Sequence, residues 1–314
     1  MSHYGSEAKA EPNPRRWKRL AAILALVITL IGLALGLGLG IGLRSGGEEE
    51  EVPRRREKWK PEVGASWQII LRYSLDLTED SDLTPDVDVY DLDLYSNDAA
   101  VFSELRRRGK RVICYFSAGS YEHYRPDSGE FEEDDMGEEL DGWPGERWLN
   151  ISSPGIRDIM AKRIKLAAEK GCDAIDPDNV DGYKNQNGLN LTEEDSTSFI
   201  KFLSDEAANH KLAIGLKNAG EIIPSVLRFV DFCVNEQCAQ YNECDTFADF
   251  VEDGKPVFQI EYARGSPDQV EASARKESCE GEGSHKFSTV LKAMELDGWV
   301  QYCDGKSYDT AVDG

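Results

Sequence analysis

Several residue types and motifs are scarce in this chain of 314 residues. It has only four His, no Cys-x-x-Cys pair and no His/Cys cluster at zinc-ligand spacing, which argues against a zinc site. No Gly-x-Gly-x-x-Gly follows a strand, which argues against a dinucleotide-binding sheet. Basic residues are few, with 36 Lys and Arg against 59 Asp and Glu and a net charge of −23. We therefore expect no metal, no cofactor and no nucleic-acid partner.

One long apolar run lies near the N-terminus. Residues 20–43 contain no charged side chain and match the length of a membrane-spanning helix. Four Lys and Arg precede the run between positions 15 and 19. The positive-inside rule then predicts a single-pass type II membrane protein, with a cytoplasmic tail over 1–19 and a transmembrane signal anchor over 20–43. The C-terminal bulk of the chain would lie outside the cell or in a lumen, most simply at the plasma membrane.

Three glycines in the apolar run, Gly32, Gly36 and Gly40, recur every four residues. Small residues at this spacing let transmembrane helices pack closely, so a weak homodimer is one interpretation. Glycine tolerated in lipid is the alternative, and the pattern does not decide between them.

Seven cysteines fit an oxidising compartment, where pairs are expected. Cys238 and Cys244 are placed to close a small loop, and Cys279 and Cys303 to tie down the C-terminal segment. The other three, Cys114, Cys172 and Cys233, lie in apolar contexts and are interpreted as small buried hydrophobic residues. Two glycosylation sequons, at Asn150 and Asn190, are usable only in a luminal or extracellular domain.

The organisation of the remaining chain predicts an α/β fold. Residues 44–62 form a charged linker, and strands and helices alternate over 63–314. Eight apolar strand candidates cover 67–71, 87–92, 111–116, 173–176, 212–217, 229–234, 256–261 and 286–291. Helices lie between them; one is expected to begin at Ser153-Pro154 and end at Gly171, and a short one to begin at Ser266-Pro267. We therefore predict a (β/α)8 TIM-type barrel preceded by one transmembrane helix.

A long segment follows the third strand, over about residues 117–152. Between Tyr121 and Glu146 it holds eleven acidic residues and one Arg. Such a segment is a lid or binding loop, or else its acidic tip at 132–135 is a mobile, solvated loop. Aromatic side chains such as Trp143 favour a sugar-binding lid.

Polar residues end most of the predicted strands. In a barrel the C-terminal strand ends form one face, where catalytic side chains lie. The strand-end candidates are Gln68, Asp91, Asp93, Tyr115, Ser117, Asp176, Asp178, Lys217, Asn218, Glu236, Glu261 and Tyr262. Two strand-end carboxylates from distant parts of the chain, Asp178 and Glu236, provide what a glycosidase needs.

Six segments together resemble a known family. They are Val89–Asp93, Val112–Ser120, Lys170–Asp173, Asp176–Tyr183, Gly215–Asn218 and Val234–Cys238, in this order along the chain. They resemble the endo-α-1,4-polygalactosaminidase family of glycoside hydrolases, and the chain is most similar to a fungal, membrane-anchored member. The resemblance implies a (β/α)8 barrel that cleaves α-1,4-linked galactosamine polymers of the galactosaminogalactan type internally. It also implies that Asp178 and Glu236 are the catalytic pair. Asp176, where members commonly have Glu, and Cys233 depart from the family pattern.

The chemistry of the residues suggests roles for this pair. An ionised Lys217 near Asp178 would keep it a carboxylate, suited to be the nucleophile, whereas Glu236 would need a raised pKa to act as acid and base. The reverse assignment stays open. Substrate-binding or orienting roles are expected for Asp91, Asp93, Tyr115, Ser117, Trp143, Asp176, Asn179, Asp181, Lys217, Asn218 and Tyr262. A cationic or partly acetylated galactosamine polysaccharide would suit the acidic domain.

Two other functions remain possible from the sequence. A type II membrane glycosyltransferase would share the tail, anchor and stem, and Asp91-Leu92-Asp93 reads as the metal-binding D-x-D of such enzymes. A non-catalytic carbohydrate-binding surface protein on a decayed barrel would have lost one catalytic carboxylate, whereas both are present.

Overall fold

The computed structural model describes residues 57–313. The predicted cytoplasmic tail, transmembrane anchor, glycine-spaced dimer contact and most of the linker lie outside the described residues. Within them, no helix is both long and apolar enough to cross a bilayer.

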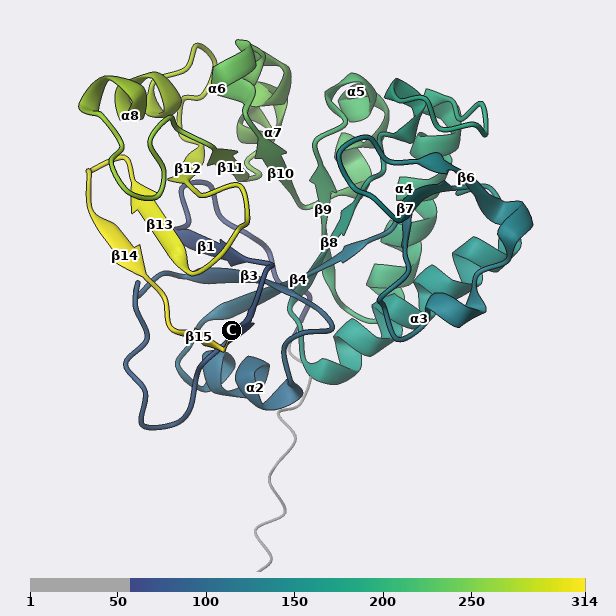
Figure 1. Cartoon of the computed structure of the whole chain (residues 1–314), viewed down its shortest axis with the longest axis horizontal. Helices are drawn as coiled ribbons and strands as arrows, with labels where there is room; N and C mark the ends of the chain where they lie inside the picture. Colours follow the sequence, from purple (N-terminus) through teal and green to yellow (C-terminus); the bar gives the residue numbers. More distant parts are fainter. Residues whose placement is uncertain (1–56, 314) are drawn as a thin grey trace, which may run out of the picture. The chain divides into compact units, whose positions relative to one another are not determined.

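One mixed sheet of ten strands dominates the described domain (Figure 1). Its order is β1-β3-β4-β8-β9-β10-β11-β12-β13-β14. The strands span Trp67–Ile70 (β1), Val89–Asp93 (β3), Arg111–Ser117 (β4), Ala174–Asp178 (β8), Ala213–Lys217 (β9), Phe232–Glu236 (β10), Val257–Glu261 (β11), Ser288–Leu291 (β12), Trp299–Tyr302 (β13) and Ser307–Asp309 (β14). The first eight pair in parallel and correspond one to one with the eight strands expected from the sequence.

The two ends of the parallel series approach each other. The indole of Trp67 in β1 donates a hydrogen bond to the Ser288 carbonyl of β12 at 2.7 Å, and the Ser288 hydroxyl donates to the Ala65 carbonyl at 2.6 Å. From the antiparallel strand β13, the Tyr302 hydroxyl donates to the Trp67 carbonyl at 2.9 Å. The sheet is thus curled, and its order and direction are consistent with a TIM-type barrel.

Helices connect most of the parallel strands. They are α2 (Ala99–Arg107), α3 (Pro154–Lys170), α4 (Glu193–Asn209), α5 (Ile223–Val226), α6 (Cys238–Tyr241), α7 (Ala248–Glu252) and α8 (Ala272–Cys279). The predicted start and end of α3 are confirmed, because the Ser153 side chain accepts from the Gly155 N–H and Gly171 is left-handed at φ 96°. The helix expected at Ser266-Pro267 is wrong, since α8 begins at Ala272 and a turn occupies the earlier residues.

The acidic segment after β4 is folded, and we refer to it below as the lid, after its predicted role. Strands β5 (Ser120–Glu122), β6 (Met136–Glu139) and β7 (Glu146–Leu149) form an antiparallel sheet of order β5-β7-β6. The acidic tip at 132–135 is not a free loop, because Asp135 accepts hydrogen bonds from Ser153 at 2.7 Å and Asn150 at 3.4 Å. A separate two-stranded pair joins β2 (Ser74–Leu75) to β15 (Val312–Asp313).

Two apolar clusters divide the core. The inner one contains side chains such as Trp67, Val89, Ile113 and Phe232, which alternate along the strands with outward-facing residues. The outer cluster, which includes Leu92 and the buried faces of the helices, packs against the other side of the sheet. The inner cluster fills the N-terminal half of the strands and leaves their C-terminal ends to polar groups.

Three disulfides cross-link the domain. The expected pairs Cys238–Cys244 and Cys279–Cys303 are present. The interpretation of Cys114 and Cys172 as unpaired hydrophobic residues is wrong, because they form a third disulfide between β4 and the start of β8. Cys233 is the free, buried thiol among the described residues.

Candidate active site

Three consecutive parallel strands bring a lysine between two carboxylates. Asp178 ends β8, Lys217 ends β9 and Glu236 ends β10. The Lys217 Nζ lies 3.2 Å from Asp178 Oδ2 and 3.4 Å from Glu236 Oε2. The lysine side chain is 2% exposed, whereas those of Asp178 and Glu236 are 18% and 25% exposed. Both carboxylates therefore reach solvent while the cation that joins them is buried.

The charges of Asp178, Lys217 and Glu236, which we call the triad, stabilise the ionised forms of Lys217 and Glu236. Burial acts to lower the pKa of Lys217, but the charges of Asp178, Glu236 and Asp176 outweigh it and hold the pKa well above its ordinary value. Burial acts to raise the pKa of Glu236, but Lys217 and hydrogen bonds from Tyr262 and Asn218 hold it below its ordinary value. Lys217 is thus an ammonium and Glu236 a carboxylate in the unliganded protein.

Neutral donors complete the coordination of both carboxylates. The Tyr115 hydroxyl donates to Asp178 Oδ2 at 2.9 Å, and the Tyr262 hydroxyl donates to Glu236 Oε1. Asn218 binds Glu236 twice, since its Nδ2 donates to Oε2 at 3.2 Å and its Oδ1 accepts the Glu236 N–H at 2.9 Å. Asp178 also accepts the Asn179 N–H on Oδ1 at 2.7 Å, so each carboxylate is oriented by a tyrosine and a second donor.

Each of the three strands ends in a left-handed residue directly after its functional side chain. Asn179, Asn218 and Gln237 have φ of 60°, 50° and 63°. Non-glycine residues in this region are uncommon and cost free energy, although Asn tolerates it better than most. The abrupt turn ends each strand at its functional residue.

A close backbone approach fixes the Asp178 strand end against the lid. The N–H groups of Ala118 and Gly119 donate to the Asp178 carbonyl at 2.9 and 3.0 Å. A Cβ at Gly119 would lie 1.7 Å from the Asn179 carbonyl oxygen, so only glycine fits there. The Asn179 amide donates to the buried Ser117 hydroxyl at 2.9 Å. Ser117 and Asn179 thus hold the strand end, and Ser117 has almost no exposed surface.

Asp91 and Asp176 lie deeper than the triad. Both have 0% exposure, and neither carboxyl has a hydrogen-bond donor. Burial raises the pKa of each, and their mutual proximity adds to the effect for Asp91. Complete burial favours an orienting role over direct contact with substrate.

Asp93 and Asp181 lie on either side of these groups. Asp93 forms an ion pair with Arg125 of the lid at 2.7 Å and accepts two backbone N–H bonds from Tyr95 and Ser96. Burial, followed by the charge of Asp178, raises the pKa of Asp181 to about 6. Asp93 therefore anchors the lid, whereas Asp181 is a partly exposed acid beside the nucleophile candidate.

The D-x-D motif does not have the geometry of a metal site. Asp91 is fully buried without a donor or cation, and the carboxylate of Asp93 is occupied by Arg125. Among residues 57–313, no group of three or more His, Cys, Asp and Glu side chains is arranged to bind a metal. The structure thus gives the glycosyltransferase alternative no support.

Two strand-end residues have structural partners instead. Gln68 donates to the Gly298 carbonyl and to Thr310, both at 3.1 Å, and so joins β1 to the C-terminal segment. Glu261 accepts the Ala239 N–H at 2.8 Å at the start of α6. The polar strand-end residues that remain candidates for the active site therefore lie on, or directly after, the strands from β3 to β11.

The lid adds two buried carboxylates that sequence reasoning did not single out. Glu122 and Glu146 are 3% and 8% exposed, and the Tyr124 hydroxyl donates to both, at 2.7 and 3.4 Å. Burial, with the charge of Glu122, raises the pKa of Glu146 to about 7. Trp143 is 60% exposed on the turn between β6 and β7, so its aromatic face is available to a ligand.

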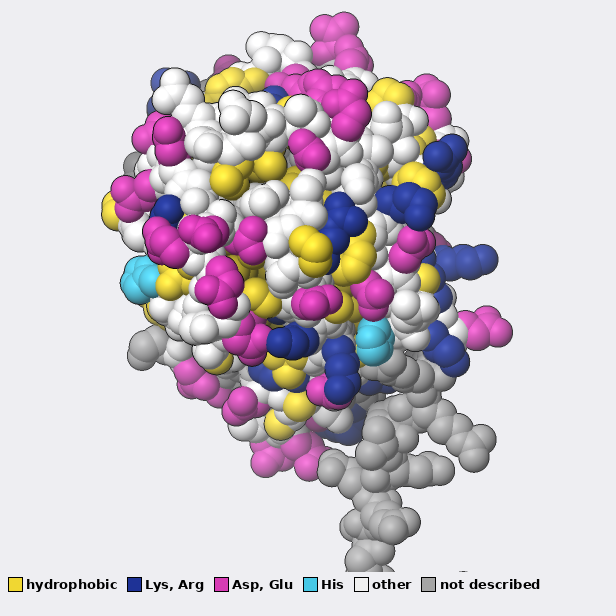
Figure 2. Space-filling view, turned by 90° about the vertical axis from the view of Figure 1, so that its right-hand side faces the viewer, with side chains coloured by type: hydrophobic (Ala, Val, Ile, Leu, Met, Phe, Trp, Pro, Cys, Tyr) yellow, Lys and Arg dark blue, Asp and Glu magenta, His cyan; other side chains and the backbone are white. Residues whose placement is uncertain are grey.

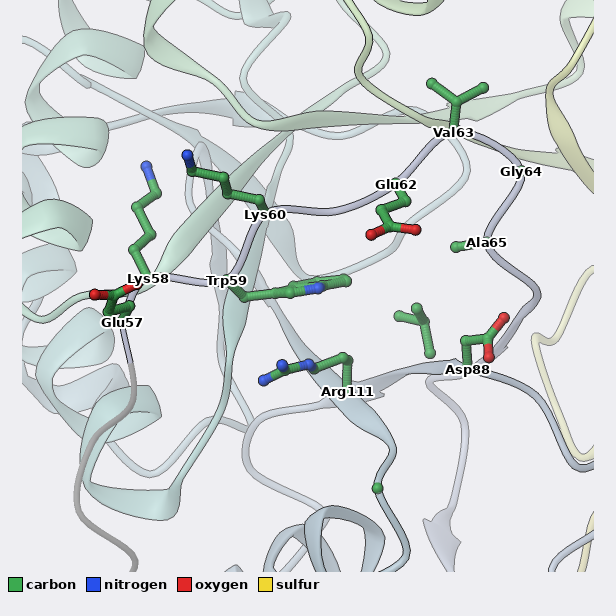
Figure 3. Close-up of a pocket in the computed structure, with 12 residues that line it drawn as sticks. Glu57, Lys58, Trp59, Lys60, Glu62, Val63, Gly64, Ala65, Asp88 and Arg111 are labelled. Atoms are coloured by element: carbon green, nitrogen blue, oxygen red, sulfur yellow. The ribbon is translucent and has the colours of Figure 1, made fainter.

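A cavity of about 970 Å³ lies at the opposite, N-terminal end of the strands (Figure 3). Trp59 and Arg111 line it, with the Arg111 guanidinium 6.0 Å from the Trp59 ring centre. Asp88 there already accepts hydrogen bonds from Ser66. None of the catalytic candidates lies in this cavity, so the chemistry belongs to the other end of the sheet.

Comparisons with solved structures identify the relatives of this fold. The chain is 53% identical to Ega3 of Aspergillus fumigatus, solved in complex with galactosamine, with a TM-score of 0.75 over 79% of this chain and 99% of that one. The glycoside hydrolase domain of PelA from Pseudomonas aeruginosa matches at 13% identity and a TM-score of 0.54, over 78% and 98% of the two chains. Trehalulose synthase MutB from Pseudomonas mesoacidophila, at 11% identity and a TM-score of 0.51 over 75% and 64%, shares the fold.

Sequence comparison agrees with the fold. A search of curated proteins gave no match. The sequence profile of glycoside-hydrolase family GH114 matches residues 48–308, which include every strand of the large sheet except the last residue of β14. The resemblance seen in the six motif segments is therefore confirmed, and the chain belongs to glycoside-hydrolase family GH114.

Proposed function

We propose that this protein is an endo-acting glycosidase that hydrolyses α-1,4-linked galactosamine-containing polysaccharide. The observation that carries the proposal is the pair Asp178 and Glu236, both reaching solvent and joined by the buried Lys217. Family membership and the galactosamine bound to Ega3 support the same reaction and the same class of substrate.

The separation of the two carboxylates favours retention of the anomeric configuration. Asp178 Oδ2 and Glu236 Oε2 are at most 6.6 Å apart, the sum of their 3.2 and 3.4 Å contacts with Lys217. Tetrahedral ammonium geometry at Lys217 brings them to about 5 Å. Retaining enzymes place their carboxyl groups about 5–5.5 Å apart, whereas inverting enzymes need about 6.5–9.5 Å for a water.

The two residues then take different roles in two steps. The Asp178 carboxylate attacks the anomeric carbon while the glycosidic bond breaks, and the leaving oxygen takes the proton of Glu236. This forms a glycosyl ester on Asp178. Water next attacks the same carbon, gives its proton to Glu236 and releases the Asp178 carboxylate. Lys217 and Tyr115 orient the Asp178 carboxylate for the first step.

The lowered pKa of Glu236 has a consequence for the working pH. The acid form of Glu236 is needed in the first step, and Lys217 and Tyr262 hold its pKa below the ordinary value in the free protein. The rate should therefore fall as pH rises above that value, which gives an acidic optimum. Galactosamine residues are fully protonated under the same conditions, so the substrate is then most cationic.

Charge supports a cationic polysaccharide as substrate. The chain carries a net charge of −23, and acidic side chains are spread over the face shown in Figure 2. On the lid, Tyr124 is 57% exposed, and its hydroxyl donates to the carboxyls of Glu122 and Glu146. An acidic surface with exposed aromatic side chains suits a sugar that bears an ammonium group.

The test incubates the purified protein with an α-1,4-linked galactosamine oligomer and reads the products by mass spectrometry. Internal cleavage supports the proposal, and an intact oligomer contradicts it. Azide added to Glu236→Ala should yield an α-glycosyl azide, and azide added to Asp178→Ala a β-glycosyl azide. The reversed pattern would exchange the two roles.

Three finer features belong to the same proposal. The curled sheet would close as a complete (β/α)8 barrel. Residues 20–43 would anchor the enzyme as a type II membrane protein, with residues 63–314 at the cell surface. N-glycosylation would then occur on the exposed Asn190. Labelling of intact cells with an antibody to the catalytic domain tests the orientation, because a cytoplasmic domain would stay unlabelled.

A further inference from the structure

Two carboxyl groups of the lid lie directly opposite each other on neighbouring strands. Glu122 in β5 and Glu146 in β7 are partners in the antiparallel register, and they are 3% and 8% exposed. Side chains at such positions share one face of the sheet, where like charges destabilise the pair. Two ionised groups here would therefore repel each other with little water between them.

The cation beside this pair is already occupied. Arg125 donates to both oxygens of Glu122, at 2.8 Å each, and its third nitrogen lies 2.7 Å from Asp93 Oδ2. Its single positive charge thus serves two carboxylates. An ionised Glu146 would add a third negative charge to one cation, so the surroundings favour the protonated form of Glu146.

The Tyr124 hydroxyl indicates where that proton lies. Its oxygen is 2.7 Å from Glu122 Oε1 and 3.4 Å from Glu146 Oε1. A hydroxyl has one proton and donates to one carboxyl at a time, and the shorter contact is with Glu122. A protonated Glu146 can then donate to the Tyr124 oxygen, whereas an ionised Glu146 would face the lone pairs of that oxygen.

A chain of hydroxyl groups joins the other oxygen of Glu146 to the Asp178 strand end. The Ser117 hydroxyl accepts from the Asn179 amide at 2.9 Å and from the Ser120 N–H at 3.1 Å, and it lies 2.6 Å from the Ser120 hydroxyl. Because both of its lone pairs are used, Ser117 donates its own proton to Ser120. Asn179 also donates to the Ser120 hydroxyl at 3.2 Å, so the Ser120 proton is left for Glu146 Oε2, at 3.4 Å.

We propose that Glu146 is a positioning residue that, in its protonated form, couples the lid to the Asp178 strand end. The protonated carboxyl donates to Tyr124 and accepts from Ser120. The chain ends at Asn179, whose N–H donates to Asp178 Oδ1 at 2.7 Å. The coupling rests on these hydrogen bonds, whereas its effect on hydrolysis rests on the proposed function.

The charges around Glu146 set the pH range in which the coupling is lost. The titratable and charged groups near its carboxyl and backbone are Glu122, His123, Tyr124, Arg125 and, on β6, Glu139. Burial, followed by the charge of Glu122, raises the pKa of Glu146 from 4.5 to about 7. In an opened lid the carboxyl would titrate near its ordinary pKa. The closed lid is therefore most stable below about pH 4.5, loses stability as the pH rises to about 7, and loses no more above it.

Hydrogen exchange of the lid tests the coupling without any activity. Mass spectrometry of the full-length protein compares the protection of β5 and β7 at about pH 4.5 and about pH 8, corrected for the intrinsic exchange rates. Wild-type protection should fall about 10-fold or more between the two conditions. Glu146→Gln keeps a donor for Tyr124 and an acceptor for Ser120 without a charge, so its protection should be the same at both.

The matched control is Glu132→Gln. Glu132 belongs to the same lid, and its exposed side chain forms no cap hydrogen bond. This variant removes an equal charge and should keep the wild-type fall in protection. A wild-type protein without the fall, or an equal fall in Glu146→Gln, overturns the proposal.

Kinetics test the positioning role. The ratio of kcat/KM in Glu146→Gln to that in the wild type should be about 1 at about pH 5 and about 10 at about pH 8, because only the wild type loses the coupling. Glu146→Ala removes both hydrogen bonds, so its kcat should fall about 10-fold at about pH 5, with KM changed by less than about threefold. Thermal unfolding shows whether each variant is folded.

The outcomes separate the coupling from the proposed function. A ratio for Glu146→Gln that is the same at both pH values would refute the positioning role, because a merely structural role does not depend on the charge of Glu146. Wild-type protein that shows the pH-dependent protection but no hydrolysis would refute the proposed function and leave the coupling intact.

Discussion

Replacement of Lys217 by methionine separates the charge of this residue from its volume. The ammonium lies 3.2 Å from Asp178 Oδ2 and 3.4 Å from Glu236 Oε2. At these distances each attraction amounts to about 5 kcal/mol with an effective dielectric constant of about 20. Because one pKa unit corresponds to about 1.4 kcal/mol, the full effect on Glu236 would be about 3–4 units. The 25% exposure of the Glu236 side chain lets water replace part of the lost cation.

We therefore expect Lys217→Met to raise the pKa of Glu236 by about 1–3 units. The sign follows from the cation, which favours the charged form of Glu236 in the wild type. Without it, Glu236 stays protonated to higher pH, so the alkaline limb of kcat/KM moves up. The maximal rate should still fall about 100-fold, because Asp178 loses its orienting partner.

The assay measures release of reducing ends from an α-1,4-linked galactosamine oligomer across the pH range. The matched control is Lys201→Met, since the Lys201 Nζ pairs only with Asp205, at 3.0 Å, on the exposed face of α4. An alkaline limb that stays within a few tenths of a unit of the wild type, in a folded Lys217→Met protein, would refute the argument.

Three further predictions follow from single contacts. Gly119→Ala should reduce kcat/KM by more than about 100-fold, because its Cβ would meet the Asn179 carbonyl oxygen at 1.7 Å, whereas Gly129→Ala, with open space around its Cβ, should be neutral. Tyr262→Phe removes a donor to Glu236, so the alkaline limb should move up by less than in Lys217→Met and kcat/KM should fall about 10-fold. In protein secreted from a eukaryotic host, peptide mass spectrometry should find glycan on the exposed Asn190 and none on Asn150, whose amide donates to Asp135; equal occupancy would contradict this.

The strands were predictable because their apolar runs are interrupted by clear turn and cap signals. Parallel strands end at one edge of a sheet, so Asp178, Lys217 and Glu236 were expected to meet there. The structure adds the order of the three and places the lysine in the middle. The asparagines after Asp178 and Lys217 were a readable signal of the left-handed turns, since Asn tolerates that conformation.

Other features depend on contacts that no local pattern encodes. Cys114 and Cys172 are 58 residues apart, and an apolar context is the same for a free thiol and a disulfide. In the acidic run after β4, the pairing of β5 with β7 buries Glu122 and Glu146, while the adjacent His123 and Gly145 stay exposed. Alternation along a strand predicts that Asp91 faces inward. Only the neighbouring strands show that its carboxyl has no hydrogen-bond donor.

The balance of charge around Lys217 explains why this site suits an amino sugar. When Glu236 carries its proton for the first step, the pH lies below the raised pKa of Asp176, about 7, so Asp91 and Asp176 are neutral and the paired charges of Asp178 and Lys217 remain. These two charges cancel each other. An oxocarbenium-like transition state is positive, and an ammonium on the adjacent carbon of galactosamine makes that charge harder to form. A single buried cation that is paired with a carboxylate adds little to this repulsion, whereas a second cation there would oppose both the substrate and its transition state.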